Sequence, residues 1–316
     1  MTPAEPVSDV RLPWSATITG AFVVTLVRPL SWALGLAGFL AGGGIIIVSW
    51  PIVVLPTPTG LQNALGGPVS SIAFGAPSTA LLALIIGGAL AAAALIAAGL
   101  LAGAWAEREG IPVTLEAAAD EGIAVPMPDL EGAPGWGRVA IIRALSLVPV
   151  IIAAVLSARP LYDVTYQELV LPNDLATPLP IRVLGRIPGL IAGVALVWLL
   201  SDAAAAVGVR RLVLERRSVL GAWGLGWADL VRRPLRVLPT ALVGLGVMVL
   251  SAGPGLIAAS IGWVRVRDVV LSGRDPLTVL VALLIWVGIW LGALVLAGVG
   301  AAVRSAAWTL ELPRRR

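Results

Sequence analysis

Two ionisable side chains, Asp202 and Arg143, stand inside apolar stretches, where their types could support chemistry. Asp202 lies about 12 Å, on an ideal helix, from Arg210 at the polar end of its stretch, and Arg143 lies about 6 Å inside the preceding stretch. Antiparallel helices would bring the carboxylate and the guanidinium together, with Ser201 adding a hydroxyl. Because a mid-span charge costs about 2.5–3.5 kcal/mol, the pair is either a proton, ion or substrate site or a buried ion pair that fixes helix register. We favour the structural interpretation.

A second group of residues suits lipid headgroups. Residues 218–233 place apolar side chains at helical spacing, and arginines flank them. Indole rings favour the headgroup level and arginines attract anionic lipids, so the pattern predicts an interfacial amphipathic helix. Residues 15–27 predict a similar, less charged helix. The alternative is that each segment extends the spanning helix that follows it. The candidate headgroup contacts are Arg216, Arg217, Trp223, Trp227, Arg232, Arg233 and Arg236.

The composition excludes several function classes. The chain has no His and no Cys, so imidazole or thiolate metal sites, disulfides and the usual serine or cysteine catalysis cannot form. We therefore predict no metal, no cofactor and no enzymatic activity. The net charge of +4 and pI of about 10.8 could indicate nucleic acid. The arginines, however, stand at the ends of apolar segments, which indicates membrane topology and no nucleic-acid partner.

Most of the chain is apolar enough to lie in a membrane. Apolar residues make up 58% of it, the mean hydropathy is +0.96, and a spanning helix needs about 20 such residues. We predict an all-α polytopic membrane protein with six transmembrane helices in three hairpins, with interfacial helices before the first and fifth spans. The predicted spans are residues 32–55, 79–105, 139–157, 188–208, 237–263 and 276–303.

The arginine distribution predicts the orientation and the segments. Most arginines fall in the N-terminal segment, the second-to-third and fourth-to-fifth connections and the tail, which places both termini in the cytoplasm. A chain rich in Ala, Gly, Val and Arg, without Lys, favours a bacterial cytoplasmic (inner) membrane.

We interpret residues 1–316 as one integral membrane domain, divided into an N-terminus with interfacial helix (1–31), hairpin 1 (32–105), an acidic cytoplasmic linker (106–138), hairpin 2 (139–208) with external loop 159–187, a basic interfacial segment (209–236), hairpin 3 (237–303) and a basic tail (304–316).

Two connections carry further expectations. The linker holds seven carboxylates against Arg108 alone, from Glu107 to Glu131, so we expect a solvated segment. The alternative is that it packs against the basic segment. In the external loop, Tyr162, Val164, Tyr166 and Val170 share one parity ahead of Pro172, which predicts a short strand or hairpin.

Two short segments look like copies. Residues 26–30 (LVRPL) open the first hairpin and residues 230–235 (LVRRPL) open the third, which indicates an internal duplication.

Residues 212–223 (LVLERRSVLGAW), followed by 230–235, resemble the membrane domain attached to some bacterial glycerophosphodiester phosphodiesterases and found alone in many integral membrane proteins. The phosphodiesterase barrel, with its metal-binding carboxylates and His, has no counterpart here. The resemblance therefore implies a non-catalytic membrane module.

The leading hypothesis is a non-catalytic module that organises lipids or partner proteins at the cytoplasmic membrane. Its expected partners are anionic membrane lipids and either a second copy or another membrane protein. The alternative is a permease subunit of a transporter, an ABC-type exporter half or another six-span carrier, because six spans preceded by an interfacial helix also describe such subunits.

Overall fold

A computed structural model describes residues 12–52, 75, 78–123, 125, 128, 130–170, 177 and 179–312. Every regular element in this part of the chain is helical, and six helices are long and apolar enough to cross a membrane, as predicted. The elements are α1 (Trp14–Val27), α2 (Pro29–Phe39), η1 (Leu40–Gly44), α3 (Ile45–Ser49), η2 (Trp50–Ile52), α5 (Thr79–Asp120), α6 (Trp136–Val170), α7 (Leu179–Arg186), α8 (Pro188–Glu215), α9 (Val219–Arg232), α10 (Pro234–Leu271) and α11 (Pro276–Glu311).

Four helices begin with proline at the first helical position, namely α2, α8, α10 and α11. Proline suits this position because its missing N–H would have no partner in the first turn. The predicted starts of the fourth and sixth spans, at residues 188 and 276, coincide with helix starts. The helices nevertheless extend well beyond several predicted spans, most of all α5 and α6.

The first span is not one regular helix. After α2 the chain forms a π-helical stretch, η1, and Gly43 within it has φ 98°. This left-handed backbone is open to glycine because glycine has no Cβ. The run Gly42–Gly44 thus permits a break in the span before α3 continues.

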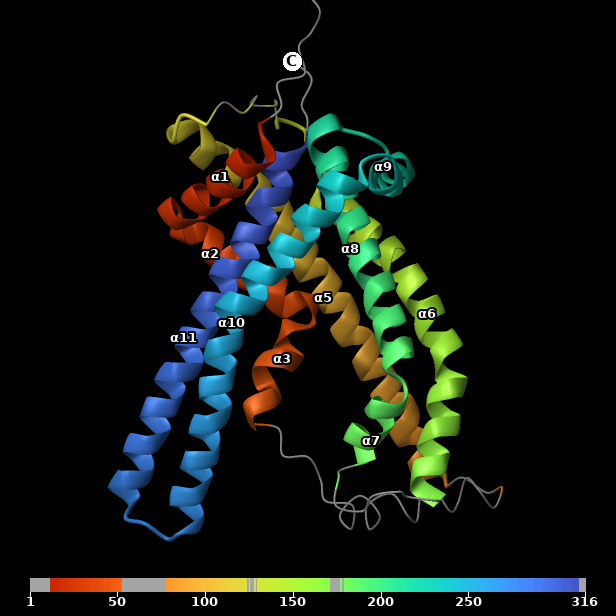
Figure 1. Ribbon diagram of the computed structural model, residues 1–316, viewed down its shortest axis with the longest axis vertical. Helices are drawn as coiled ribbons and strands as arrows, with labels where there is room; N and C mark the ends of the chain where they lie inside the picture. Colours follow the sequence, from red (N-terminus) through yellow and green to blue (C-terminus); the bar gives the residue numbers. More distant parts are fainter. Residues whose placement is uncertain are drawn as a thin grey trace, which may run out of the picture.

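The helices form two arms that meet at one end and diverge toward the other (Figure 1). One arm contains α10 and α11 with α2 packed on α11, and the other contains α6 and α8 with α9 packed on α8. Helix α5 contacts both arms through α2 and α6. We call the shared end, which holds α1, α9 and the C-terminal end of α11, the basic end. The end with α7 and the α10–α11 turn is the opposite end.

Glycines bring the helices of the arm that contains α2, α10 and α11 into close contact. A Cβ on Gly298 of α11 would lie 2.7 Å from the Trp32 carbonyl oxygen of α2, and one on Gly255 of α10 would lie 2.7 Å from the Ala293 Cβ of α11. Small residues are the usual means of close helix approach in membranes, where lipid removes the hydrophobic drive for association.

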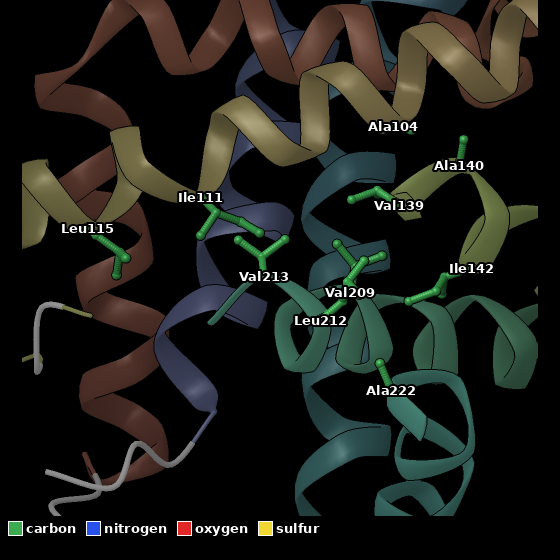
Figure 2. Close-up of a cluster of buried hydrophobic side chains, with 10 residues drawn as sticks. All are labelled: Ala104, Ile111, Leu115, Val139, Ala140, Ile142, Val209, Leu212, Val213 and Ala222. Atoms are coloured by element: carbon green, nitrogen blue, oxygen red, sulfur yellow. The ribbon is translucent and has the colours of Figure 1, made fainter. Parts of the chain in front are cut away.

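The buried core lies at the basic end. Figure 2 shows its largest cluster, which joins α5, α6, α8 and α9. Ile111 and Leu115 of α5 are fully buried there against Val213 and its neighbours. The expectation of a solvated linker is therefore wrong for residues 107–120, which continue α5 as a packed helix. Their apolar side chains recur at helical spacing and outweigh the scattered carboxylates.

The expected strand in the external loop is also wrong. Residues 162–170 are the end of α6, and the rings of Tyr162 and Tyr166 stack with centroids 6.3 Å apart, one helical turn from each other. Pro160 lies inside the helix without ending it. The buried Glu168 carboxylate accepts hydrogen bonds from Arg182 of α7 at 3.1 Å and pairs with Arg186 at 2.7 Å. The turn expected at residues 172–174 lies outside the described residues.

The two segments interpreted as copies share one local layout. Helices α1 and α9 each have 14 residues, a single non-helical residue follows (Arg28 or Arg233), and proline then opens the next helix. Their surroundings differ, because α1 packs on α11 whereas α9 packs on α8.

Candidate functional site

The structure brings Arg143 and Asp202 together. Arg143 on α6 donates from Nη1 to Oδ1 of Asp202 on α8, at 3.0 Å. The antiparallel course of these two helices puts both residues on the facing surfaces, as the sequence argument required. Their side chains keep a minor exposure, 26% for Arg143 and 18% for Asp202.

Four further residues extend the pair into a network that spans four helices. Arg143 also binds both carboxylate oxygens of Glu107 on α5, at 2.7 and 2.8 Å. Arg210 on α8 pairs with Glu107 and donates to the hydroxyl of Ser305 at 3.0 Å. Arg304 on α11 pairs with Asp202. The network thus links α11 of one arm to α5, α6 and α8 at the junction of the arms.

The bonding of the network favours a structural role. Each of the four carboxylate oxygens of Glu107 and Asp202 accepts from a guanidinium. Arginine stays protonated at any physiological pH, so these acceptors are permanently occupied by cations. Within the described residues, no three side chains among His, Cys, Asp and Glu gather in a group that could hold a metal ion.

Sequence reasoning missed Glu107, Arg210 and Arg304 because each stands near the end of an apolar run, where a charge ordinarily faces water or headgroups. One signal could have identified Glu107. The apolar spacing of α5 continues past it through Ile111 and Leu115, so the helix had to remain packed beyond the charge. In the structure, Gly244 of α10 leaves room for the Arg304 side chain, since a Cβ there would come 2.8 Å from Arg304 Cγ.

Within the predicted interfacial segment the chain forms the helix α9, which begins after Ser218 and ends at Arg232. Its location at the membrane surface stays a prediction. The Ser218 hydroxyl caps α9 by accepting from the Gly221 N–H at 3.3 Å. Its axis runs across the long axis of the bundle at the basic end (Figure 1). Asp229 anchors it to α8 through an ion pair with Arg211 at 2.8 Å.

The apolar stripe predicted for α9 divides between two faces. Trp223 and Trp227 pack against the inner clusters with their rings 6.4 Å apart, and both indole nitrogens are buried. Both side chains are partly buried against clusters that include α8 residues, and their role as headgroup contacts stays a prediction. The exposed apolar residues are instead Leu220, Val231 and, at the start of α10, Leu235, with exposures of 70%, 78% and 88%.

The five candidate arginines differ in their contacts. Arg216 donates to the Glu131 carbonyl, Arg217 pairs with Glu215 at 3.4 Å, and Arg236 pairs with Glu311 at 3.3 Å. Arg232 and Arg233 form no ion pair with any residue that the structure describes. These two therefore remain the best placed for an external anion.

No protein family, curated protein or solved structure that was compared matches this chain. The resemblance of residues 212–235 to a phosphodiesterase-associated membrane domain stays a prediction.

Proposed function

We propose that this polytopic membrane protein is a non-catalytic module of a bacterial cytoplasmic membrane and that α9 binds anionic lipid headgroups at the cytoplasmic face. The observation that carries the proposal is the exposed surface where α9 ends and α10 begins. Arg232 and Arg233, without ion pairs in the described part of the chain, stand beside the exposed side chains of Val231 and Leu235. An apolar side chain next to an unpaired guanidinium is the arrangement that an interfacial helix presents to a membrane.

The energetics favour anionic lipid at this surface. A basic residue near an anionic leaflet contributes about 1 kcal/mol. Arg232 and Arg233 lie at the α9–α10 junction, so their contributions act on the same few headgroups. Arg236 lies one turn further on and adds to the positive charge there, although it also pairs with Glu311. The ion pair between Arg211 and Asp229 holds α9 to the protein, which fixes where those lipids gather. The proposed activity is thus local lipid organisation and not a chemical reaction.

The experiment compares lipids that co-purify from membranes of mixed phosphatidylcholine and phosphatidylglycerol. We expect enrichment of phosphatidylglycerol around the wild-type protein and a clear loss of it in Arg232→Gln/Arg233→Gln/Arg236→Gln. The matched control is Arg265→Gln/Arg267→Gln/Arg274→Gln, which removes the same charge at the opposite end. Equal enrichment in the two triple variants would contradict the proposal, because the effect would then follow net charge alone.

A further inference from the structure

Helix α7, at the opposite end, carries its charged and apolar side chains on the reverse faces of an ordinary surface helix. It has eight residues and lies between the end of α6 and the start of α8 (Figure 1). Arg182 turns inward and pairs with Glu168 of α6, whose side chain is only 2% exposed. Ile181 and Leu184 are exposed to 60% and 51%, and Val183 is the one buried residue of α7. A helix at a protein–water surface does the opposite, with charges outward and apolar residues inward.

This arrangement suits lipid and not water. A charge in a low-dielectric medium is tolerated where it faces protein and has a partner of opposite charge, as the Arg182–Glu168 pair does. The exposed side chains of Ile181 and Leu184 have no polar group, so acyl chains can cover them without cost, whereas water would leave their apolar area unburied. The orientation of α7 therefore indicates acyl chains as the medium on its outer side.

The length of α8 places α7 at the edge of a bilayer. Arg211 stands at the basic end of α8, where it pairs with α9, and Pro188 begins the helix about 35 Å away on ideal geometry. The hydrocarbon core of a bilayer is about 30 Å thick. Because α7 ends at Arg186, just before α8 begins, it lies at the level of the second headgroup–acyl boundary.

Two neighbouring features of α6 and α7 fit the same boundary. Tyr162 and Tyr166 lie within two turns of Glu168 on α6 and are exposed to 68% and 57%. Tyrosine is enriched at membrane interfaces, where its ring and its hydroxyl meet different media. Arg186 pairs with Glu168 at 2.7 Å and remains 41% exposed. Such an arginine can keep its aliphatic part in the apolar layer while its charged group extends toward the headgroups.

We propose that α7 is a lipid-binding surface in the leaflet at the opposite end, held against α6 by the Glu168 carboxylate and inserted so that Ile181 and Leu184 contact acyl chains. The inference goes beyond the proposed function, because it concerns the other leaflet and needs no anionic headgroup. With α9 at one surface and α7 at the other, the arm of α6 and α8 contacts lipid at both ends.

The experiment identifies the medium around single spin labels, which the absence of native Cys allows. Labels at Ile181→Cys and Leu184→Cys are compared in phosphatidylcholine vesicles for collisions with oxygen, which concentrates in hydrocarbon, and with a nickel chelate, which stays in water. We expect an oxygen-to-nickel ratio several-fold above that of Ser272→Cys in the α10–α11 turn and closer to that of Leu196→Cys at an exposed position of α8. Val183→Cys, at the buried position of α7, collides slowly with both reagents.

A second variant tests the ion pairs that hold α7. Glu168→Gln leaves two guanidinium groups without their carboxylate, so we expect the nickel collision rate at Leu184→Cys to rise, whereas Arg159→Gln at an exposed position of α6 leaves it unchanged.

Three outcomes would overturn the inference. The first is an oxygen-to-nickel ratio at both α7 labels as low as at Ser272→Cys, which would show that water surrounds them. The second is slow collision of both labels with both reagents, which would show that protein covers the helix. The third is an unchanged nickel rate in Glu168→Gln. Because phosphatidylcholine has no net charge, none of these results depends on the anionic lipid enrichment proposed for α9.

Discussion

Gly226 of α9 lies against the backbone of Ala204 in α8, so closely that a Cβ on Gly226 would come 2.2 Å from the Ala204 carbonyl oxygen. Gly208 makes a similar approach to the Ala222 carbonyl oxygen at 3.1 Å. The position of α9 is therefore fixed by backbone contact as well as by the Asp229–Arg211 pair.

Substitution of Gly226 tests this contact. We expect Gly226→Ala to destabilise the protein by about 1–3 kcal/mol, the usual range for overpacking, because the backbone of α8 cannot yield as a flexible side chain can. A Cβ on Gly224 of the same helix would have no neighbouring atom within 4 Å. Gly224→Ala is the matched control and raises stability by about 0.5–1 kcal/mol, since alanine favours helix. Unfolding in detergent measures both, and changes of the same sign would contradict the contact.

The charge network predicts energetic coupling between Arg143 and Asp202. Arg143→Ala and Asp202→Ala each leave a partner charge in low dielectric, so each lowers folded yield, and the double variant recovers part of the loss. We expect a coupling energy of about 0.5–3 kcal/mol in the double-mutant cycle. The exposed pair Arg217–Glu215 is the control and couples by under about 1 kcal/mol. Additive losses at Arg143 and Asp202 would show that the observed contact carries no energy.

Asp275 predicts a pH dependence. Its carboxylate accepts from the Thr278 hydroxyl at 2.7 Å and the Leu277 N–H at 2.9 Å, and these bonds hold its pKa below the usual range. Because this pKa is lower in the folded state than in the unfolded state, the ionised carboxylate stabilises the folded protein at pH values above the unfolded-state pKa. This contribution is lost as the pH falls through the folded-state pKa. The Tm difference between wild type and Asp275→Asn is therefore constant near neutral pH and shrinks below about pH 4. Ser78→Ala, at the uncharged cap of α5, gives a difference without this pH dependence.

The orientation is tested by thiol labelling, which the absence of native Cys makes clean. We expect Ser272→Cys, in the α10–α11 turn, to react with a membrane-impermeant reagent in intact cells, and Glu116→Cys to react after lysis only. Cysteines at positions 60 and 174, which lie outside the described residues, are expected to react in intact cells as Ser272→Cys does. Reaction at Glu116→Cys but not at Ser272→Cys in intact cells would reverse the topology.

The sequence predicts the six spans well because each apolar run is too long to be buried easily anywhere other than in a membrane. It predicts the contact of Arg143 with Asp202 for a geometric reason, namely that antiparallel neighbours align residues of similar depth. Arg304 could not be paired with Asp202 in the same way. That contact depends on how the α10–α11 arm meets α8, and neither hairpin length nor depth fixes the packing of one arm on another.

The expectations for α9 and α6 share one physical limit. Periodicity identifies an apolar face but does not say whether protein or lipid covers it, so Trp223 and Trp227 could be assigned to headgroups although they pack inward. In α6, Tyr162 and Tyr166 fit a strand by parity and a helix by their spacing of four. The helix forms because the backbone hydrogen bonds of the preceding part of α6 continue through these residues.

The contact between α1 and α11 has a consequence for synthesis. Ala21 of the first helix and Leu310 of the last share one buried cluster, so the ribosome must add nearly the whole chain before α1 meets its partner. At roughly 5–20 residues per second, that interval is about 15–60 seconds. During it, the face of α1 that later covers α11 lacks its α11 partner, and a nascent chain stalled before residue 303 would leave that face without the α11 residues of the cluster.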